Sequence, residues 1–210
     1  MPDHIFLADP HPIGENDTLI SYFSKYKNMR IEGHISQVKE QEDFFRKLVV
    51  DEFSKYENVK AMEVGFNAGH SALIILESHP NVELTSFDIG EFKSAFIGSW
   101  FLKNKYPNRF KIVWGDSKTT IPEIPDSERY DFIFIDGGHD HLTAMKDLKN
   151  CKRLTHENTL VVMDDTIYFD GPRYSWEVAK KEGWIVEIGT KDFNHREIGG
   201  KGMSWGRYIL

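Results

Sequence analysis

Two short stretches decide the fold of this chain: FIFIDGGH at residues 132–139 and LVVMDD at residues 160–165. Each begins as an uninterrupted apolar run, the pattern of a strand buried on both faces of a parallel sheet. Each then ends in acidic residues. If the two strands are neighbours, their carboxyl ends meet at one edge of the sheet, where open α/β sheets bind ligands. The sequence therefore predicts a carboxylate cluster at that edge.

The predicted cluster has the chemistry of a metal site with a base beside it. Asp136, Asp164 and Asp165 are hard oxygen ligands of the kind that Mg²⁺ or Mn²⁺ prefers. No cysteine accompanies them, which argues against structural zinc. His139 has an ordinary pKa near 6.5 and suits proton transfer at neutral pH. In the alternative interpretation, Asp165 caps a turn and His139 starts the next helix.

The composition is that of one ordinary globular domain. Of the 210 residues, 40% are hydrophobic and 28% are charged. The net charge of −7 disfavours a nucleic-acid partner. No apolar run reaches membrane-spanning length, so no membrane partner is expected. Cys151 is the single cysteine and cannot form an internal disulfide, which favours a reducing, cytoplasmic location.

Strand and helix patterns alternate from residue 60 onward. Strands are expected at 61–64, 82–87, 110–114, 131–135, 159–163, 184–188 and 203–210. Helices are expected at 36–56, 71–78, 92–105, 142–151 and 174–181. This alternation predicts a Rossmann-like, doubly wound α/β sheet. The segment 190–202 is polar and shows no crossover helix, so the last strand is predicted to run antiparallel.

The first 30 residues form a separate segment in this interpretation. They are rich in proline, with one short helical pattern, and are expected to form an N-terminal arm or lid, while residues 31–210 form the domain proper. The arm is also a candidate oligomer contact. A homodimer and a domain of a larger protein both stay open.

The turn after the first strand carries a nucleotide-binding pattern, EVGFNAGHS at residues 63–71. Gly65 permits a tight turn, Gly69 lets the backbone approach a ligand, and Ser71 can cap the helix that follows. The spacing is G-x-x-x-G, and it is not the G-x-G-x-x-G of dinucleotide-binding proteins. The candidate cofactor-binding residues of this turn are Glu63, Gly65, Asn67, Gly69 and Ser71.

The next two strand ends strengthen the pattern. Asp88 ends the second strand, where a carboxylate can accept hydrogen bonds from both ribose hydroxyls. Asp116 and Ser117 follow the third strand, where a side chain can reach an adenine amino group. An acid at one strand end can be a simple turn former. An ordered series at four successive strand ends is much less expected by chance.

In this order the motifs resemble those of the class I S-adenosylmethionine (SAM)-dependent methyltransferases, over about residues 31–165. The segment 63–71 resembles the first motif of that class. Asp88 matches its ribose-binding acid, Asp116 and Ser117 its adenine-side position, and Asp136 an acid near the methionine moiety. The resemblance implies a mostly parallel seven-stranded sheet with adjacent fourth and fifth strands.

The Asp136–His139 motif and the Asp164–Asp165 pair narrow the resemblance to the metal-dependent O-methyltransferases. The most similar branch includes macrocin-type sugar O-methyltransferases and cephalosporin-biosynthesis proteins. It implies that Asp136, Asp164 and Asp165 hold Mg²⁺ or Mn²⁺ and that His139 is the base. Catechol-type relatives have a lysine where this chain has His139, which argues against a catechol acceptor.

The expected reaction is methyl transfer from SAM to a hydroxyl group of a small molecule, with a sugar or glycoside as the leading acceptor. The sulfonium is already activated, so the protein must align the partners and supply a nucleophile. A divalent metal would orient and acidify the hydroxyl, with Asp136 and His139 as the catalytic residues. Two alternatives remain: a metal-independent methyltransferase, and a non-catalytic SAM-binding domain of a longer protein.

Overall fold

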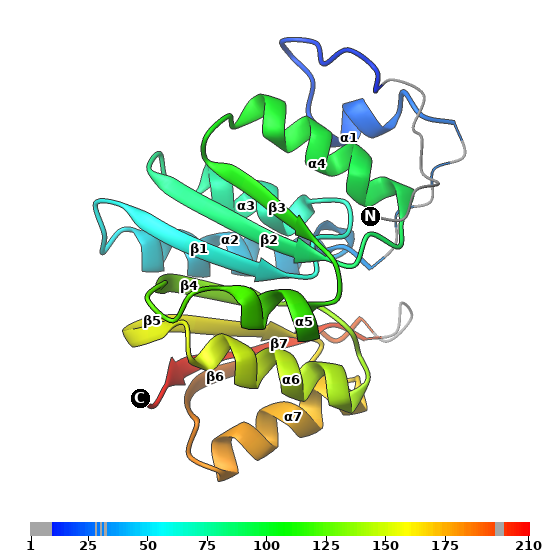
Figure 1. Ribbon diagram of the computed structural model, residues 1–210. Helices are drawn as coiled ribbons and strands as arrows, with labels where there is room; N and C mark the ends of the chain where they lie inside the picture. Colours follow the sequence, from blue (N-terminus) through cyan, green and yellow to red (C-terminus); the bar gives the residue numbers. More distant parts are fainter. Residues whose placement is uncertain (1–9, 28, 30, 32, 196–199) are drawn as a thin grey trace.

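The computed structural model describes residues 10–27, 29, 31, 33–195 and 200–210, which form a seven-stranded sheet with helices on both faces (Figure 1). The strand order is β3-β2-β1-β4-β5-β7-β6. Every neighbouring pair is parallel except those made by β7, which runs antiparallel to both β5 and β6. The strands are β1 (Val59–Val64), β2 (Val82–Asp88), β3 (Phe110–Trp114), β4 (Tyr130–Ile135), β5 (Thr155–Asp164), β6 (Ile185–Asp192) and β7 (Gly202–Tyr208).

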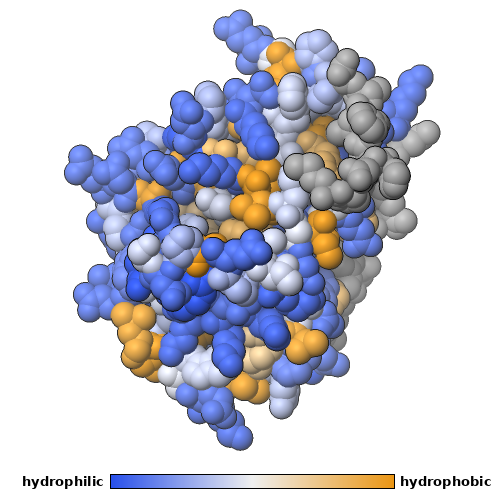
Figure 2. Space-filling view, viewed as in Figure 1, coloured by the Kyte–Doolittle hydropathy of each residue, from blue (hydrophilic) through white to orange (hydrophobic). Residues whose placement is uncertain are grey.

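Two layers of helices cover the sheet (Figure 1). One layer is α2 (Lys39–Phe53), α3 (His70–Glu77) and α4 (Lys93–Lys105), with the 3-10 helix η1 (Ile35–Gln37) before it and α1 (Leu19–Phe23) against α4. The other is α5 (Ser117–Thr120), the 3-10 helix η2 (Ile121–Glu123), α6 (His141–Lys152) and α7 (Asp170–Lys181). The space-filling view looks onto the second layer. Hydrophilic side chains cover most of that face, and hydrophobic ones form small separate groups (Figure 2).

The core has two halves because the inner strands are apolar on both faces. Phe132 and Phe134 of β4 pack with the α2 layer, where Phe45 lies 4.6 Å from Phe134 between ring centroids. Ile133 and Ile135 point the other way and pack with the α6–α7 layer. Alternate residues of a strand face opposite sides of a sheet, so an uninterrupted apolar run fills both halves.

Strand register brings the predicted site to one edge of the sheet. Val64 of β1 pairs with Ile135 of β4, and Ile135 pairs in turn with Met163 of β5. The residues that follow these three are therefore side by side at the carboxyl edge. They are Gly65, Asp136 and Asp164, all named by the sequence pattern.

The predicted doubly wound sheet is confirmed, including its antiparallel last strand and the adjacent fourth and fifth strands. Two details differ. No helix was expected at residues 117–120, where the structure has the short helix α5, capped by Asp116. Ser71 was expected to cap α3, and this was wrong: the capping position is Gly69, and the Ser71 hydroxyl donates to Glu63 instead.

The expected arm falls partly on residues 1–9, 28 and 30, which lie outside the described residues. In the described part, α1 buries Leu19, Tyr22 and Phe23 in the core. Among the described residues, no helix combines the length and the hydropathy needed to span a bilayer.

Candidate active site

A cavity of about 450 Å³ opens at the carboxyl edge of β1, β2, β3 and β4. It is lined by the turns after all four strands. Of the predicted cofactor-binding residues, six line it: Gly65, Asn67, Asp88, Asp116, Ser117 and Asp136. Glu63, Gly69 and Ser71 do not line it. The predicted base, His139, forms part of the wall.

Gly65 is required by the close approach of two turns. Its φ is +90°, and a Cβ there would lie 1.9 Å from the carbonyl oxygen of Asp136. No side chain fits between these backbones. Gly65 therefore lets the first turn pack directly on the start of the Asp136 motif and keeps both at the cavity wall.

Glu63 lies beneath this turn and supports it. The side chain is fully buried and accepts hydrogen bonds from Ser71 (2.5 Å) and Ser86 (2.6 Å). Burial raises the pKa of Glu63 to about 8, although both hydroxyl contacts act to lower it. Glu63 and Ser71 thus join β1, β2 and α3 behind the cavity and hold the turn after β1 in position.

Asp88 binds the backbone of the turn that it faces. One carboxylate oxygen accepts the N–H groups of Phe66 (3.0 Å) and Asn67 (2.8 Å), and the other accepts that of Gly90 (2.7 Å). Each carboxylate oxygen has two lone pairs, so the oxygen bound to Gly90 retains one acceptor position. Asp88 both orders the turn and lines the cavity.

A buried carboxyl group holds the turn after β3. Ser117 donates to Asp147 of α6 at 2.6 Å, and Asp116 accepts the backbone N–H of Lys118. Asp147 is fully buried, and burial raises its pKa to about 6. Its second oxygen lies beneath Gly137, 3.0 Å from where a Cβ at that position would be. Ser117, predicted to face adenine, is thus already engaged by Asp147.

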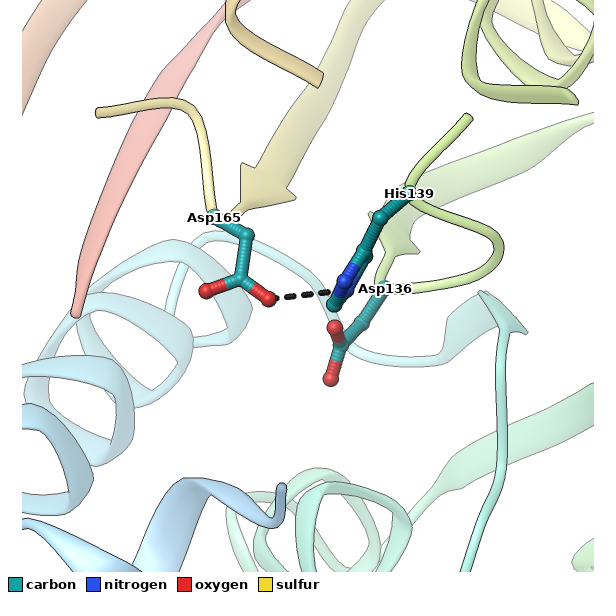
Figure 3. A group of neighbouring side chains, drawn as sticks. All are labelled: Asp136, His139 and Asp165. Carbon is teal, nitrogen blue, oxygen red and sulfur yellow. Dashed lines mark ion pairs between the residues drawn. The ribbon is translucent and has the colours of Figure 1, made fainter. Parts of the chain in front are cut away.

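Asp136, His139 and Asp165 converge at the other side of the cavity (Figure 3). Asp136 and His139 come from the turn after β4, and Asp165 follows β5. One potential ligand atom from each lies within 4.8 Å of the others. His139 Nε2 is 2.9 Å from a carboxylate oxygen of Asp165, and its ring packs 4.3 Å from that of Phe169. His139 precedes α6, and the residue that caps this helix is Asp140. The His139 imidazole therefore does not cap the helix.

Asp164, the third predicted metal ligand, stands outside this group of three. Both of its oxygens accept hydrogen bonds from the Gln41 amide of α2, each at 2.9 Å. Burial, followed by the charge of Asp165, raises the pKa of Asp164 to about 7. The pKa of Asp136 is raised well above its usual value by burial and then by Asp164 and Asp165. Three carboxyl groups share one poorly solvated edge.

Lys201 supplies a positive charge to this edge. Its ammonium group is buried and lies 3.8 Å from Oδ1 of Asp165. That oxygen is also buried and accepts no hydrogen bond from the described residues. Asp165 itself has a φ of +60°, a left-handed conformation that is uncommon for a non-glycine residue. The strained backbone directs one oxygen to His139 and the other toward Lys201.

The residues at this edge fit a divalent cation. Asp165 Oδ1 is a buried acceptor without a donor, and the nearby Asp136 carboxyl and His139 nitrogen provide further hard or borderline ligands. One lysine offsets only part of the charge of three carboxylates when all are ionised. A cation in this position would be held by the three predicted ligands, Asp136, Asp165 and the adjacent Asp164.

Sequence reasoning missed Gln41 and Asp147 and left Lys201 unassigned. Gln41 lies 123 residues from its partner Asp164, and nothing in the local pattern of α2 marks it. Asp147 is one of several polar residues in α6. A buried polar residue in an amphipathic helix is a weak signal, and only the three-dimensional fold identifies its partner.

Comparisons with known proteins identify the family and the fold. Residues 62–166, half of the chain, match a family model described as a methyltransferase domain. The matched segment runs from β1 through the Asp164–Asp165 pair and contains every strand end that lines the cavity. The chain belongs to this methyltransferase family. A search of curated proteins finds no match.

Solved structures share the fold at low sequence identity. An O-methyltransferase from Bacillus cereus, solved with S-adenosylhomocysteine (SAH), has a TM-score of 0.70 and 15% identity, covering 90% of this chain and 88% of its own. The O-methyltransferase TomG from Streptomyces achromogenes, solved with SAM, has a TM-score of 0.71 and 12% identity, covering 93% and 92%. The N-methyltransferase NodS from Bradyrhizobium japonicum, solved with SAH, has a TM-score of 0.64 and 11% sequence identity. The match covers 92% of this chain and 100% of that of NodS. These likenesses establish the Rossmann-like methyltransferase fold.

Proposed function

We propose that this protein transfers a methyl group from SAM to a hydroxyl group of a small molecule, with a sugar or glycoside as acceptor. One observation carries the proposal: in a member of a methyltransferase family, a cavity of suitable size for a nucleotide cofactor lies next to a cluster of two carboxylates and a histidine. The cavity bordered by Gly65, Asp88 and Asp116 suits the nucleotide cofactor. The Asp136, His139 and Asp165 cluster at its wall suits deprotonation of an acceptor.

His139 is the proposed general base. Donation of its Nε2 hydrogen to Asp165 fixes the tautomer and leaves the lone pair on Nδ1. The imidazolium formed on taking a proton is stabilised by the same carboxylate, as in other carboxylate–histidine pairs. Asp165 thereby orients the base. Asp136 lies in the same cluster, close to where the cofactor and the acceptor must meet.

Asp136, Asp164 and Asp165 are the proposed ligands of a divalent cation, Mg²⁺ or Mn²⁺. When bound, such an ion would orient the acceptor and lower the pKa of its hydroxyl. Gln41 supports this arrangement by fixing the plane of the Asp164 carboxyl group. The orphaned oxygen of Asp165 remains available while its other oxygen pairs with His139.

The test is a transfer assay with methyl-labelled SAM against sugars, glycosides and catechols, with and without Mn²⁺. We expect labelled glycoside and loss of turnover in His139→Gln and Asp136→Asn, while SAH still binds by calorimetry. Chelation by EDTA should stop turnover, and added Mn²⁺ should restore it. Transfer only to amines or carboxylates would contradict the proposed acceptor.

One observation favours a second candidate, a metal-independent methyltransferase. The buried ammonium of Lys201 already places a positive charge 3.8 Å from Asp165. In that case Lys201 and Asp165 alone would hold His139 in its reactive orientation. Full turnover in EDTA, combined with loss of turnover in Lys201→Met, would identify this second mechanism.

A further inference from the structure

A second cavity, of about 660 Å³, lies beside the cofactor cavity and shares His139 with it. It is formed by the start of α6 and the first two turns of α7. Its lining residues are His139, His141, Asp170, Gly171, Arg173, Tyr174 and Glu177. Since the proposed base borders both cavities, a molecule in the second cavity can present a hydroxyl to it.

The geometry points to this second cavity as the acceptor subsite, with Tyr174 as the platform for an uncharged glycosyl ring. This inference rests on the proposed function and adds to it the place and the class of the acceptor. Three features support it: the tight seating of α7 on His139, the exposed aromatic pair of Tyr174 and His141, and the pairing of the charged groups at the rim.

The start of α7 is seated directly on the catalytic turn. A Cβ at Gly171 would lie 2.0 Å from the carbonyl oxygen of His139, so the two backbones are in contact and only glycine fits. The ring of Phe169, just before α7, packs on the His139 ring. The position of Tyr174, one turn further along α7, is therefore coupled to that of the base.

Tyr174 and His141 form an exposed ring pair. Tyr174 is 58% exposed, and its ring lies 4.5 Å from that of His141 in an edge-to-face arrangement. His141 is held by the Ser175 hydroxyl, 3.0 Å from Nδ1. An exposed tyrosine costs little conformational entropy on binding and presents a flat apolar face with a polar tip. Such a face suits the C–H surface of a sugar ring.

The charges at the rim favour a neutral acceptor over a phosphorylated one. Arg173 is paired with Asp170, and Glu177 with Lys180 at 2.7 Å. The residues that line the cavity include two carboxylates, Asp170 and Glu177, and one guanidinium, Arg173, so the negative charge in excess disfavours a phosphate. The paired carboxylates still have free lone pairs, which can accept hydrogen bonds from vicinal hydroxyls. A neutral polyhydroxylated ring satisfies both conditions.

The experiment compares Tyr174→Ala with Tyr174→Phe in the full-length protein. Binding of methyl hexopyranosides and methyl 6-deoxyhexopyranosides, with hexose 1-phosphates as the anionic comparison, is measured by saturation-transfer NMR in the presence of SAH. We expect the glycosides to bind and the phosphates to bind at least tenfold more weakly. Tyr174→Ala should weaken glycoside binding about tenfold, Tyr174→Phe less than threefold, and SAH affinity should not change.

A matched control is Trp100→Ala on α4, which removes another exposed aromatic side chain from the opposite helix layer. It should leave glycoside binding unchanged. Equal glycoside affinity in Tyr174→Ala and wild type, tighter binding of the phosphates, or no glycoside binding at all would overturn the inference. If the inference fails in one of these ways but the protein methylates another hydroxyl acceptor, the proposed function still stands. If glycosides bind in a Tyr174-dependent way but no methyl transfer occurs, the subsite stands and the proposed function fails.

Discussion

At the scale of single residues, the site is built from buried polar groups whose partners come from distant parts of the chain. Glu63 depends on Ser71 and Ser86, and Asp164 depends on Gln41. Burying such groups is unfavourable unless each is hydrogen-bonded. The arrangement therefore fixes the orientation of the carboxyl groups and links the cofactor side of the site to the helices behind it.

Glu63 should make the stability of the fold depend on pH. Its pKa is about 8 in the folded protein and near 4.5 when unfolded. Between these values only the unfolded state releases the proton, so stability is full below about pH 4.5 and falls by up to about 1.4 kcal/mol per pH unit as pH rises toward 8. Glu63→Gln should flatten this part of the curve in urea titrations. The exposed Glu83→Gln on β2 should not, and parallel curves for all three proteins would contradict the prediction.

Gln41 should act on divalent-cation binding without touching the cofactor. Gln41→Met keeps the side-chain volume but removes both hydrogen bonds to Asp164. Loss of such an orienting contact typically weakens metal binding by about tenfold or more. Calorimetry with Mn²⁺ should show this loss, with unchanged SAH affinity. Gln37→Met, at an exposed position just before α2, serves as the control. Equal Mn²⁺ affinity in wild type and Gln41→Met would remove Gln41 from the site.

At the scale of elements, the turns decide the geometry. Gly65→Ala should be far more damaging than an alanine at an open left-handed glycine. Its Cβ would collide with the Asp136 carbonyl, at a φ of +90°. Gly183 has a φ of +71° and open space around it, so Gly183→Ala isolates the backbone strain, about 1 kcal/mol. We expect a loss of about 3 kcal/mol or more for Gly65→Ala in urea unfolding. Similar losses for both would show that the close approach does not matter.

The sequence predicts elements well where a pattern is local. Uninterrupted apolar runs identify β4 and β5, and the missing crossover helix before β7 identifies its direction. Prediction from the sequence fails where the contact that decides the local structure comes from a residue distant in the chain. Ser71 was expected to cap α3, but the helix begins one residue earlier, after Gly69, and the Ser71 hydroxyl donates to the buried Glu63. The short polar helix α5 carries no apolar face and left no periodic signal.

The same limit applies to the site. The motif order groups Gly65, Asp88, Asp116 and Asp136, and the structure places all four at one cavity. It could not separate the three acids of the edge, because the Gln41 amide that distinguishes Asp164 comes from α2. Nor could it reveal that Lys201, just before β7, reaches Asp165. Charge neutralisation at this edge is a property of the folded sheet and of no single segment.

At the scale of the whole molecule, cofactor binding should stabilise the fold as one unit. The cavity is lined by turns from β1, β2, β3 and β4, so it exists only when these four strands are paired. Saturation with SAH at about 100 times its Kd should raise the free energy of unfolding by about 2.7 kcal/mol. Thermal melts should show this as a rise in Tm of roughly 5–10 °C. Asp88→Asn keeps a hydrogen-bond acceptor in the turn but removes its charge, and most of the rise should be lost. No rise in the wild-type protein would contradict the assignment of the cavity.

The position of β7 has a consequence for how the chain is made. It follows β6 in the sequence yet lies between β5 and β6 in the sheet. While the ribosome is still synthesising residues before 202, the open edge of β5 has no neighbour and β6 has nothing to pair with. Unpaired strand edges are templates for wrong association. The nascent protein thus passes through a stage in which the cofactor half can already be complete while the other half waits, and that stage is where a chaperone would matter most.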